Sequence, residues 1–338
     1  MTENKNVVSD DGIVRTPDAK IPGMYTVNAP ATAKLKIKKF LKDNYVGWTF
    51  NSLLFVGLVV FTFIPAIYSL YMSFYRTDGV NLWQWYGLKN YRMIFAEKWA
   101  NETKGALLNT FYYTAVSVPL SLVTSYFVAL LVNTKIKGVN AFRIMYYLPC
   151  MIPAIAGVFL YKDMMRYSEF TTQMGFFNRI LVGMGLPASR WVYSEGAKAI
   201  ASLFFLNLWG VGGGMILWLS AFKAIDVQFY EAADIEGASK LHKFASITIP
   251  MSTPMIFYNL IMSIIGSIQY TGSLMYSDGV SVSDSLNTLG VLIYQKAFAT
   301  AKWKGYASAL SWVMLVMIGI LTLVLFKTSS WVFYGEDE

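Results

Sequence analysis

Six long stretches of this chain contain no Asp, Glu, Lys or Arg, and no other feature constrains the fold as strongly. These charge-free stretches are residues 48–75, 106–134, 144–161, 199–222, 244–277 and 305–326. An α-helix rises ~1.5 Å per residue, so about 20 apolar residues are needed to cross ~30 Å of hydrocarbon. Five stretches reach that length, and 144–161 lies at the short end of the range. The sequence therefore predicts an all-α membrane protein with six transmembrane helices.

The fifth stretch is longer than one span requires. Pro250 and Pro254 indicate that its helix begins near residue 251, because the missing N–H of a proline costs little in the first turn of a helix. The expected spans are therefore about 48–75, 106–134, 144–161, 199–222, 251–271 and 305–326.

Composition agrees with this prediction and excludes several other classes. Apolar residues make up 55% of the chain and charged residues 14%, against about 45–50% and about 25% in soluble domains. The single cysteine, Cys150, cannot form an internal disulfide. The net charge of +8 could indicate nucleic acid, but five lysines are gathered just before the first span: Lys34, Lys36, Lys38, Lys39 and Lys42. That position is typical of a topology signal, and we expect no nucleic-acid partner.

This lysine cluster orients the chain, because lysines beside a first span stay in the cytoplasm. Residues 1–47 are then a cytoplasmic N-terminal tail, which is polar and is expected to lack regular structure for most of its length. Six crossings through 48–326 return residues 327–338 to the cytoplasm as a second tail. The prediction is a multi-pass protein of the plasma membrane, surrounded by membrane lipid, with a long inner loop at 223–250.

The inner loop has the local signals of a helix–turn–helix hairpin. Asp226 suits a helix N-cap, Gly237 suits the left-handed residue that ends a helix, and Ser239 can cap a second short helix that ends at Pro250. The hairpin would present both acidic and apolar side chains: Glu231, Asp234, Glu236, Phe229, Ile235 and Leu241. From these residues alone, a solvated connector and a docking site for a partner are about equally well supported.

The loop also carries a recognisable motif. Glu231-Ala232-Ala233, then Gly237, then Ile247-Thr248-Ile249-Pro250, resembles the EAA loop of type I ABC-importer permeases, with Ile249 where that family usually has Leu. Further matches run over about 48–326: Tyr86 to Tyr91, Leu108-Asn109-Thr110, Phe142-Arg143 with Leu148-Pro149 and Pro153, Asn178 to Trp191, and Gly290 to Ala309. The set is similar to the carbohydrate-uptake permeases of the maltose and glycerol-3-phosphate type. Ser277-Asp278-Gly279, with the insert that follows, departs from the family pattern.

This resemblance implies a fold, a site and a set of partners. The type I ABC transmembrane region would cover about 105–326, and a second homologous permease subunit would complete the pathway. A dimer of cytoplasmic ATP-binding-cassette ATPases would receive the EAA loop, in which the resemblance assigns coupling to Glu231, Ala232, Ala233, Gly237, Ile247 and Pro250. An extracellular solute-binding protein would deliver a sugar or oligosaccharide for import.

The sequence lacks the residues that other membrane functions need. It has no P-loop motif, its spans carry no ionisable group in their cores, and His242 is its only histidine. These features indicate no catalytic residues, no metal site and no cofactor, so a membrane-embedded enzyme such as a glycosyltransferase is disfavoured, as is a self-sufficient channel or secondary carrier. Free energy for uphill transport would have to come from outside the bilayer. Glycerol-3-phosphate or another polar solute remains the alternative substrate, although the spans offer no cation for an anion.

A polar stripe on the fifth span is the candidate for a wall of the substrate pathway. Asn259, Ser263, Ser267 and Tyr270 recur at about the 3.6-residue helical period, and Tyr258 lies beside them. The competing interpretation is that these side chains form hydrogen bonds between helices, including those of the second permease.

Overall fold

The computed structural model describes residues 7–8, 13–17, 25–30, 45–96, 99–134, 138–194, 196–208, 210–272, 284–299 and 302–333. The chain divides into two compact units, Met1–Ser69 and Leu70–Glu338. The predicted lysine cluster before the first span and the Ser277-Asp278-Gly279 segment lie outside the described residues.

The N-terminal unit contains an unexpected sheet. Strands β1 (Val7–Val8), β2 (Ile13–Pro17) and β3 (Tyr25–Pro30) pair antiparallel in the order β1-β2-β3. These three strands are regular structure within residues 1–47, and the remainder up to residue 44 lies outside the described residues, so the prediction for most of the tail stays a prediction. The strands are short and rich in β-branched residues, which favour extended backbone.

The first predicted span forms one long helix with a wide turn inside it. Helix α2 (Tyr45–Leu58) continues through the π-turn η1 (Val59–Phe63) into α3 (Ile64–Ser73). The N–H of Ile64 bonds to the carbonyl of Val59, five residues back, immediately before Pro65. A proline ring clashes with the carbonyl four residues before it, and the wider π-turn gives that carbonyl room.

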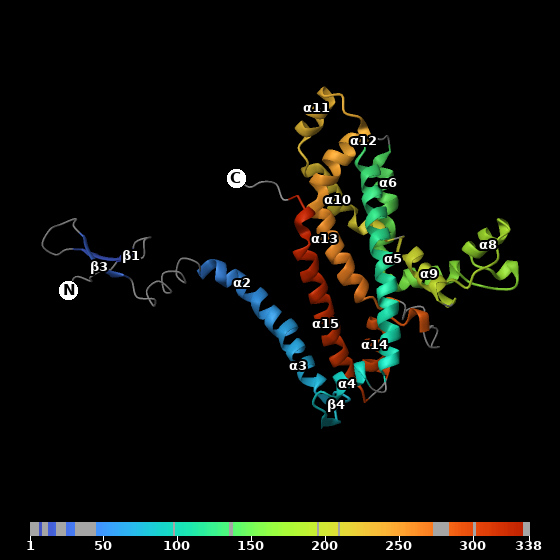
Figure 1. Ribbon diagram of the computed structural model, residues 1–338, viewed down its shortest axis with the longest axis horizontal. Helices are drawn as coiled ribbons and strands as arrows, with labels where there is room; N and C mark the ends of the chain where they lie inside the picture. Colours follow the sequence, from blue (N-terminus) through green and yellow to red (C-terminus); the bar gives the residue numbers. More distant parts are fainter. Residues whose placement is uncertain are drawn as a thin grey trace. The chain divides into compact units, whose positions relative to one another are not determined.

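Within the described residues, four helices are long and apolar enough to cross a membrane: Thr49–Ser73, Ala100–Asn133, Lys240–Ile268 and Lys304–Lys327. The last three are α5 (Ala100–Asn133), the continuous helix that ends as α13 (Ile249–Ile268), and α15 (Lys304–Lys327). Helix α13 packs against both α5 and α15, and the three lie side by side in Figure 1. They confirm the second, fifth and sixth predicted stretches as helices.

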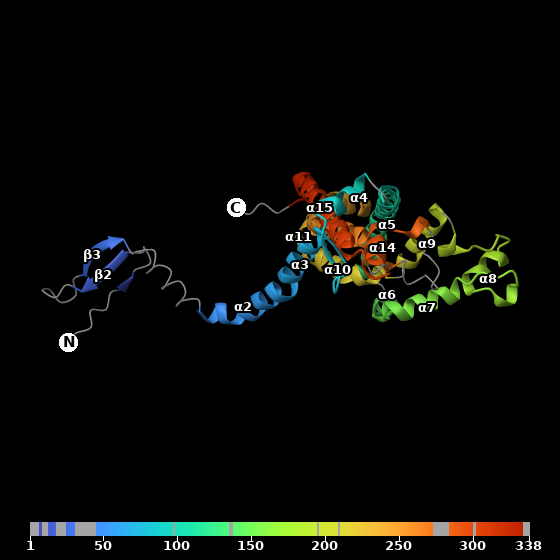
Figure 2. The same cartoon turned by 90° about the horizontal axis from the view of Figure 1, so that it is seen from below.

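The third predicted stretch is not a single straight helix. It consists of α6 (Val139–Tyr147), the 3-10 turn η2 (Leu148–Met151) and α7 (Ala154–Met164). The parts before and after residues 152–155 are bent by 103°, a change of direction visible in Figure 2. Ile152 has extended backbone, because a residue before proline is driven away from helical conformation.

The fourth predicted stretch is also divided. Helix α9 (Ala197–Leu208) and helix α10 (Met215–Ala224) are separated by the 3-10 turn η5 (Val211–Gly214). Gly210, Gly212, Gly213 and Gly214 lie in this junction, and each glycine in a helix interior costs about 1 kcal/mol relative to alanine. Helix α10 packs against α5, around a buried cluster that includes Tyr126, Trp218 and Phe222.

Short elements cover the two ends of the helices. Helices α11 (Val227–Ile235) and α12 (Lys240–Lys243) lie at one end, and β4 (Tyr75–Thr77), α4 (Lys89–Phe95) and α14 (Leu289–Tyr294) lie at the opposite end in Figure 1. The remaining elements are β5 (Trp83–Trp85), η3 (Thr171–Gln173), α8 (Phe176–Gly183), η4 (Trp191–Tyr193), η6 (Phe244–Thr248), η8 (Asp284–Leu286), η9 (Gln295–Ala299) and η10 (Ser329–Trp331).

A buried cluster joins α4, α5, α14 and α15 at the end away from α11. Its members include Ile94, Leu292, Tyr306 and Leu310. Beside it, β4 and β5 form a hairpin whose turn is closed by Asp78, which accepts hydrogen bonds from the N–H groups of residues 80, 81 and 82, each at 2.9 Å. These bonds, led by that from Val80, hold the pKa of the Asp78 carboxyl below its ordinary value.

Candidate functional site

Two short helical arms joined by a turn lie within the inner loop predicted at 223–250, and their caps are the expected residues. The side chain of Asp226 accepts a hydrogen bond from the N–H of Gln228 at 3.0 Å, and α11 begins at the next residue after the cap. Helix α11 ends at Ile235, and Gly237 has a φ of 74°, in the left-handed region. The Ser239 hydroxyl accepts a bond from the N–H of His242 at 3.2 Å and caps α12. Capping chemistry is local, so the sequence was sufficient to predict it.

The turn of the hairpin is closed by backbone hydrogen bonds on both sides of Gly237. The N–H of Gly237 donates to the carbonyl of Asp234 at 3.1 Å, and the N–H of Ala238 donates to that of Ala233 at 2.9 Å. These bonds satisfy carbonyls that the end of α11 would otherwise leave unpaired. The direction in which the chain leaves α11 is therefore fixed.

The second arm differs from its prediction, because it does not end at Pro250. Helix α12 passes through the π-turn η6 into α13 without a break, as one helix from Lys240 to Ile268. The N–H of Ile249 bonds to the carbonyl of Phe244, and Pro250 follows, as Pro65 follows η1. The wide turn accommodates the proline ring here too, so the hairpin is joined rigidly to the fifth predicted span.

Side-chain contacts tie the first arm to the second and the second to α5. Lys243 Nζ lies 2.5 Å from Asp234 Oδ1, and the hydroxyls of Tyr230 and Thr248 are 2.9 Å apart. One turn further along, the buried hydroxyls of Tyr126 and Ser252 are 3.0 Å apart. No capping signal predicts these pairs, because their partners lie 9, 18 and 126 residues apart in the sequence. They connect the hairpin to α13 and α5.

The tip of the hairpin exposes apolar side chains beside acidic ones. Ile235 is 89% exposed, Leu241 78% and Phe229 50%, while Glu231, Asp234 and Glu236 are exposed around them. Of the motif residues, Glu231, Ala232 and Gly237 are exposed, and Ala233, Ile247 and Pro250 are partly buried. An exposed apolar cluster on a rigid support is typical of a docking surface.

The polar stripe on α13 divides into two parts. Tyr258 is 48% exposed, and Asn259 and Ser263 are partly buried; the Asn259 amide donates to the carbonyl of Met255 at 2.9 Å. In contrast, the other two residues of the stripe contact α5. Ser267 Oγ donates to Thr114 Oγ1 at 3.0 Å, and the ring of Tyr270 stacks on Tyr113 with centroids 4.6 Å apart. The five residues therefore do not form one open wall.

Among the described residues, no group of three or more His, Cys, Asp and Glu side chains could hold a metal ion.

Known proteins resemble this chain over nearly its whole length. No family model matches it. A probable ABC transporter permease of Bacillus subtilis, YesP, is 34% identical over 313 residues, covering 91% of this chain and 98% of the relative. The permease MsmF of a multiple sugar-binding transport system in Streptococcus mutans is 26% identical over 296 residues, covering 87% and 98%.

A solved structure shares the fold. A bacterial alginate ABC transporter, in complex with an alginate pentasaccharide-bound periplasmic protein, contains a chain that superposes with a TM-score of 0.73 at 19% identity. The superposition covers 86% of this chain and 96% of that one.

Proposed function

Because this chain belongs to the permeases of sugar ABC transporters, we propose that it forms part of the membrane pathway by which an importer brings a sugar or oligosaccharide into the cytoplasm. Members of this family are transport components and not enzymes. The chain is a multi-pass membrane protein, and its apolar helices supply the spans.

We propose six spans. Four are the long helices, the third span is the bent pair α6–α7, and the fourth is the pair α9–α10 joined by η5. An even number of crossings puts both termini on one side, and the lysines before the first span support a cytoplasmic location for that side. The hairpin then faces the cytoplasm, and residues 162–198 face outside. The type I transmembrane region covers about 105–326.

The geometry of the hairpin is the observation that carries this function. Its tip exposes apolar and acidic side chains, its turn is fixed at Gly237, and its second arm continues as α13 without a joint. We propose that an ATPase subunit binds this tip and that closure of an ATPase dimer moves α13 and α5 through the hairpin. A second, homologous permease would complete the pathway. An extracellular binding protein would deliver the sugar, as a periplasmic protein is bound to the structurally similar alginate transporter.

Ile235→Glu together with Leu241→Glu is expected to abolish copurification of the ATPase with the permease. Both side chains are largely exposed, so these substitutions remove no packing within this subunit. They would bury two carboxylates at the interface, each of which costs several kcal/mol when unpaired. The control is Leu186→Glu, another exposed leucine in a loop on the proposed outer side. Retention of the ATPase by the double variant would disprove docking at the tip.

For the pathway, we propose that Tyr258, Asn259 and Ser263 contact substrate. Ser267 and Tyr270 would hold this part of the chain in position through their contacts with α5. Asn259→Ala is expected to lower sugar uptake about tenfold, because a lost hydrogen bond to a buried polar ligand costs about 1–2 kcal/mol. Uptake is measured in cells that express the complete transporter. Gln269→Ala, an exposed position at the end of α13 and off the stripe, is the control. Unchanged uptake and unchanged substrate-stimulated ATPase activity in Asn259→Ala would argue against the assignment.

A further inference from the structure

The β4–β5 hairpin and the end of α3 carry a cluster of aromatic side chains that the proposed function does not use. Its members are Tyr71, Phe74, Tyr75, Trp83 and Trp85, and the centres of neighbouring rings lie 4.7 to 6.2 Å apart. Aromatic rings at such distances pack against one another. These rings therefore form one continuous patch, here called the aromatic patch.

Much of the aromatic patch is exposed. Trp85 is 65% exposed, Tyr71 50% and Trp83 37%. Trp83 and Trp85 lie on the same face of β5, because side chains two residues apart in a strand point to one side. Pairing with β4 places Trp85 opposite Tyr75, and the two rings pack edge to face with their centres 5.0 Å apart. A contiguous exposed apolar patch of this kind is typical of contact with a membrane or a partner.

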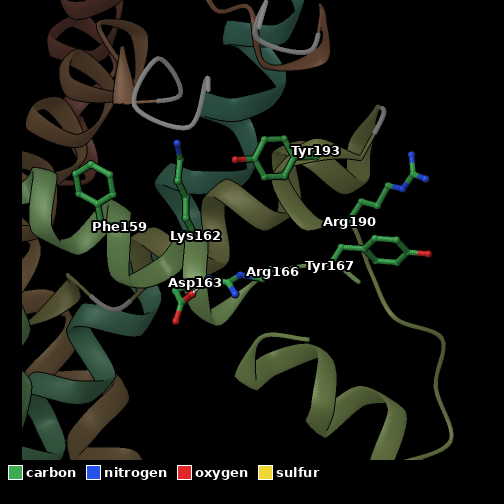
Figure 3. Close-up of a pocket in the computed structure, with 7 residues that line it drawn as sticks. All are labelled: Phe159, Lys162, Asp163, Arg166, Tyr167, Arg190 and Tyr193. Atoms are coloured by element: carbon green, nitrogen blue, oxygen red, sulfur yellow. Dashed lines mark hydrogen bonds and ion pairs between the residues drawn. The ribbon is translucent and has the colours of Figure 1, made fainter. Parts of the chain in front are cut away.

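Other exposed aromatic side chains have different surroundings. Tyr167 and Tyr193 are 42% and 49% exposed, and they line a hollow of about 530 Å³ together with charged side chains (Figure 3). The guanidinium of Arg190 lies 5.3 Å from the ring centre of Tyr167. Because charged groups are costly to place against hydrocarbon, the exposure of these two rings does not indicate lipid. The aromatic patch differs from them in its position relative to the spans.

The aromatic patch lies where two apolar helices end. Strand β4 begins two residues after the last residue of α3, and Gly305, in the first turn of α15, lies against the carbonyl of Tyr75. The helices Thr49–Ser73 and Lys304–Lys327 are both long and apolar enough to cross a membrane. Figure 1 shows β4 at the end of α15 that is remote from α11. The rings therefore lie close to the level at which the chain leaves the hydrocarbon.

Hydrogen bonds fix the β4–β5 hairpin at this level. The amide of Asn90, whose side chain is 0% exposed, donates to the carbonyl of Ser73 at 2.7 Å and to that of Tyr75 at 2.9 Å. One buried side chain of α4 thus joins the end of α3 to the start of β4. Asp78 holds the turn between the strands through its bonds to three backbone N–H groups. The exposed rings therefore belong to a rigid element and not to a free loop.

We propose that the β4–β5 hairpin is a lipid anchor, with Trp83 and Trp85 inserted among the phospholipid headgroups at the membrane–water interface. Tryptophan and tyrosine are enriched at this depth, because each combines an apolar ring with a polar N–H or O–H group. A second protein is the competing occupant, but the aromatic patch continues from the end of a membrane span, where lipid is already present. The anchor would fix the depth of α15 in the bilayer. The inference requires that the chain spans a membrane, and it does not require that the chain imports a sugar.

The test measures the surroundings of nitroxide labels by electron paramagnetic resonance, on the full chain in lipid nanodiscs. A Cys150→Ser background removes the only cysteine. Trp85→Cys and Gln84→Cys then place labels on neighbouring, exposed residues of β5 whose side chains point to opposite faces. Oxygen concentrates in lipid, whereas a nickel chelate stays in water. We expect oxygen to relax the label at position 85 more strongly than the chelate does, and we expect the reverse order at position 84.

Trp83→Cys supplies a second label on the lipid-facing side, in case Trp85→Cys does not fold, and should show the same preference for oxygen. Stronger relaxation by the chelate at both positions, in variants that melt like the parent, would place the rings in water and overturn the inference. Weak relaxation by both reagents would also overturn it, since protein would then cover the rings. Loss of the oxygen preference on assembly of the complete transporter would assign the aromatic patch to a partner subunit instead. Sugar uptake does not enter these measurements, so the proposed function is tested separately.

Discussion

Gly237→Pro is expected to abolish sugar uptake while the permease still folds and inserts. Gly237 has a φ of 74°, whereas proline is restricted to about −65° and has no N–H. The variant therefore loses the left-handed turn and also the hydrogen bond from the Gly237 N–H to Asp234. The tip of the hairpin would then point in a different direction relative to α13. The helices themselves keep their caps at Asp226 and Ser239 and their packing, so the defect should be confined to coupling.

A graded series at this position separates backbone strain from steric conflict. A Cβ at Gly237 would meet no atom within 4 Å, so any cost of a side chain is conformational. Asparagine tolerates the left-handed region and should retain most of the uptake, which makes Gly237→Asn the control. Alanine should be intermediate, because a left-handed conformation costs it about 1–2 kcal/mol, and the β-branched Gly237→Val should approach proline.

Uptake of labelled sugar and copurification of the ATPase are measured together for the series. Uptake should fall in the order glycine, asparagine, alanine, valine, proline. Normal uptake by a Gly237→Pro permease that assembles normally would refute the role of the turn in coupling.

The parts of the hairpin that depend on local capping residues could be predicted from the sequence. Asp226, Gly237 and Ser239 act on backbone groups within a few residues of themselves, and the structure confirms all three caps. The contacts that anchor the hairpin could not be predicted in the same way. Tyr126 and Ser252 lie on different helices and meet only when α5 and α13 pack.

For the spans, the sequence predicted the length of the helices but not their shape. Hydrophobic length predicted the long helices, because crossing a membrane requires about 20 apolar residues in any sequence context. It did not predict where a helix bends. Pro153 breaks its helix, while Pro65 and Pro250 lie in continuous helices, each two residues after the end of a π-turn. Pro119 and Pro254 also lie inside helices, so the presence of a proline does not by itself show whether a helix ends.

The hydrogen bonds of Asn178 could not be predicted from the sequence. Its side chain lies in α8 and donates to the carbonyls of Arg166 and Ser189. These two residues are far apart in the sequence and follow no spacing rule that would place them together.

Gly305→Ala is expected to destabilise the folded chain by about 3 kcal/mol or more, at the upper end of the cost of overpacking. A Cβ at Gly305 would lie 1.8 Å from the carbonyl oxygen of Tyr75 and 2.8 Å from that of Met72. Both obstacles are backbone, so no side-chain rotation can relieve them. The Tyr75 carbonyl also accepts a hydrogen bond at 2.9 Å from the amide of Asn90, a side chain that is 0% exposed. Helix α15 would have to move away from β4, and the buried cluster around Tyr306 would open.

Gly319→Ala is the matched control, because it adds the same methyl group to the same helix. A Cβ at Gly319 would meet no atom within 4 Å, and alanine is a better helix former than glycine by about 1 kcal/mol. This variant should melt at or above the temperature of the parent when the fraction of monodisperse detergent-solubilised protein is followed on heating. Both variants add one methyl group to the same helix, so a large difference between their melting temperatures reports the contact of Gly305 with Tyr75. Equal melting temperatures of the two variants would disprove the close approach of α15 to β4. An added methyl group that conflicts with the Tyr75 carbonyl cannot be accommodated unless the helix moves.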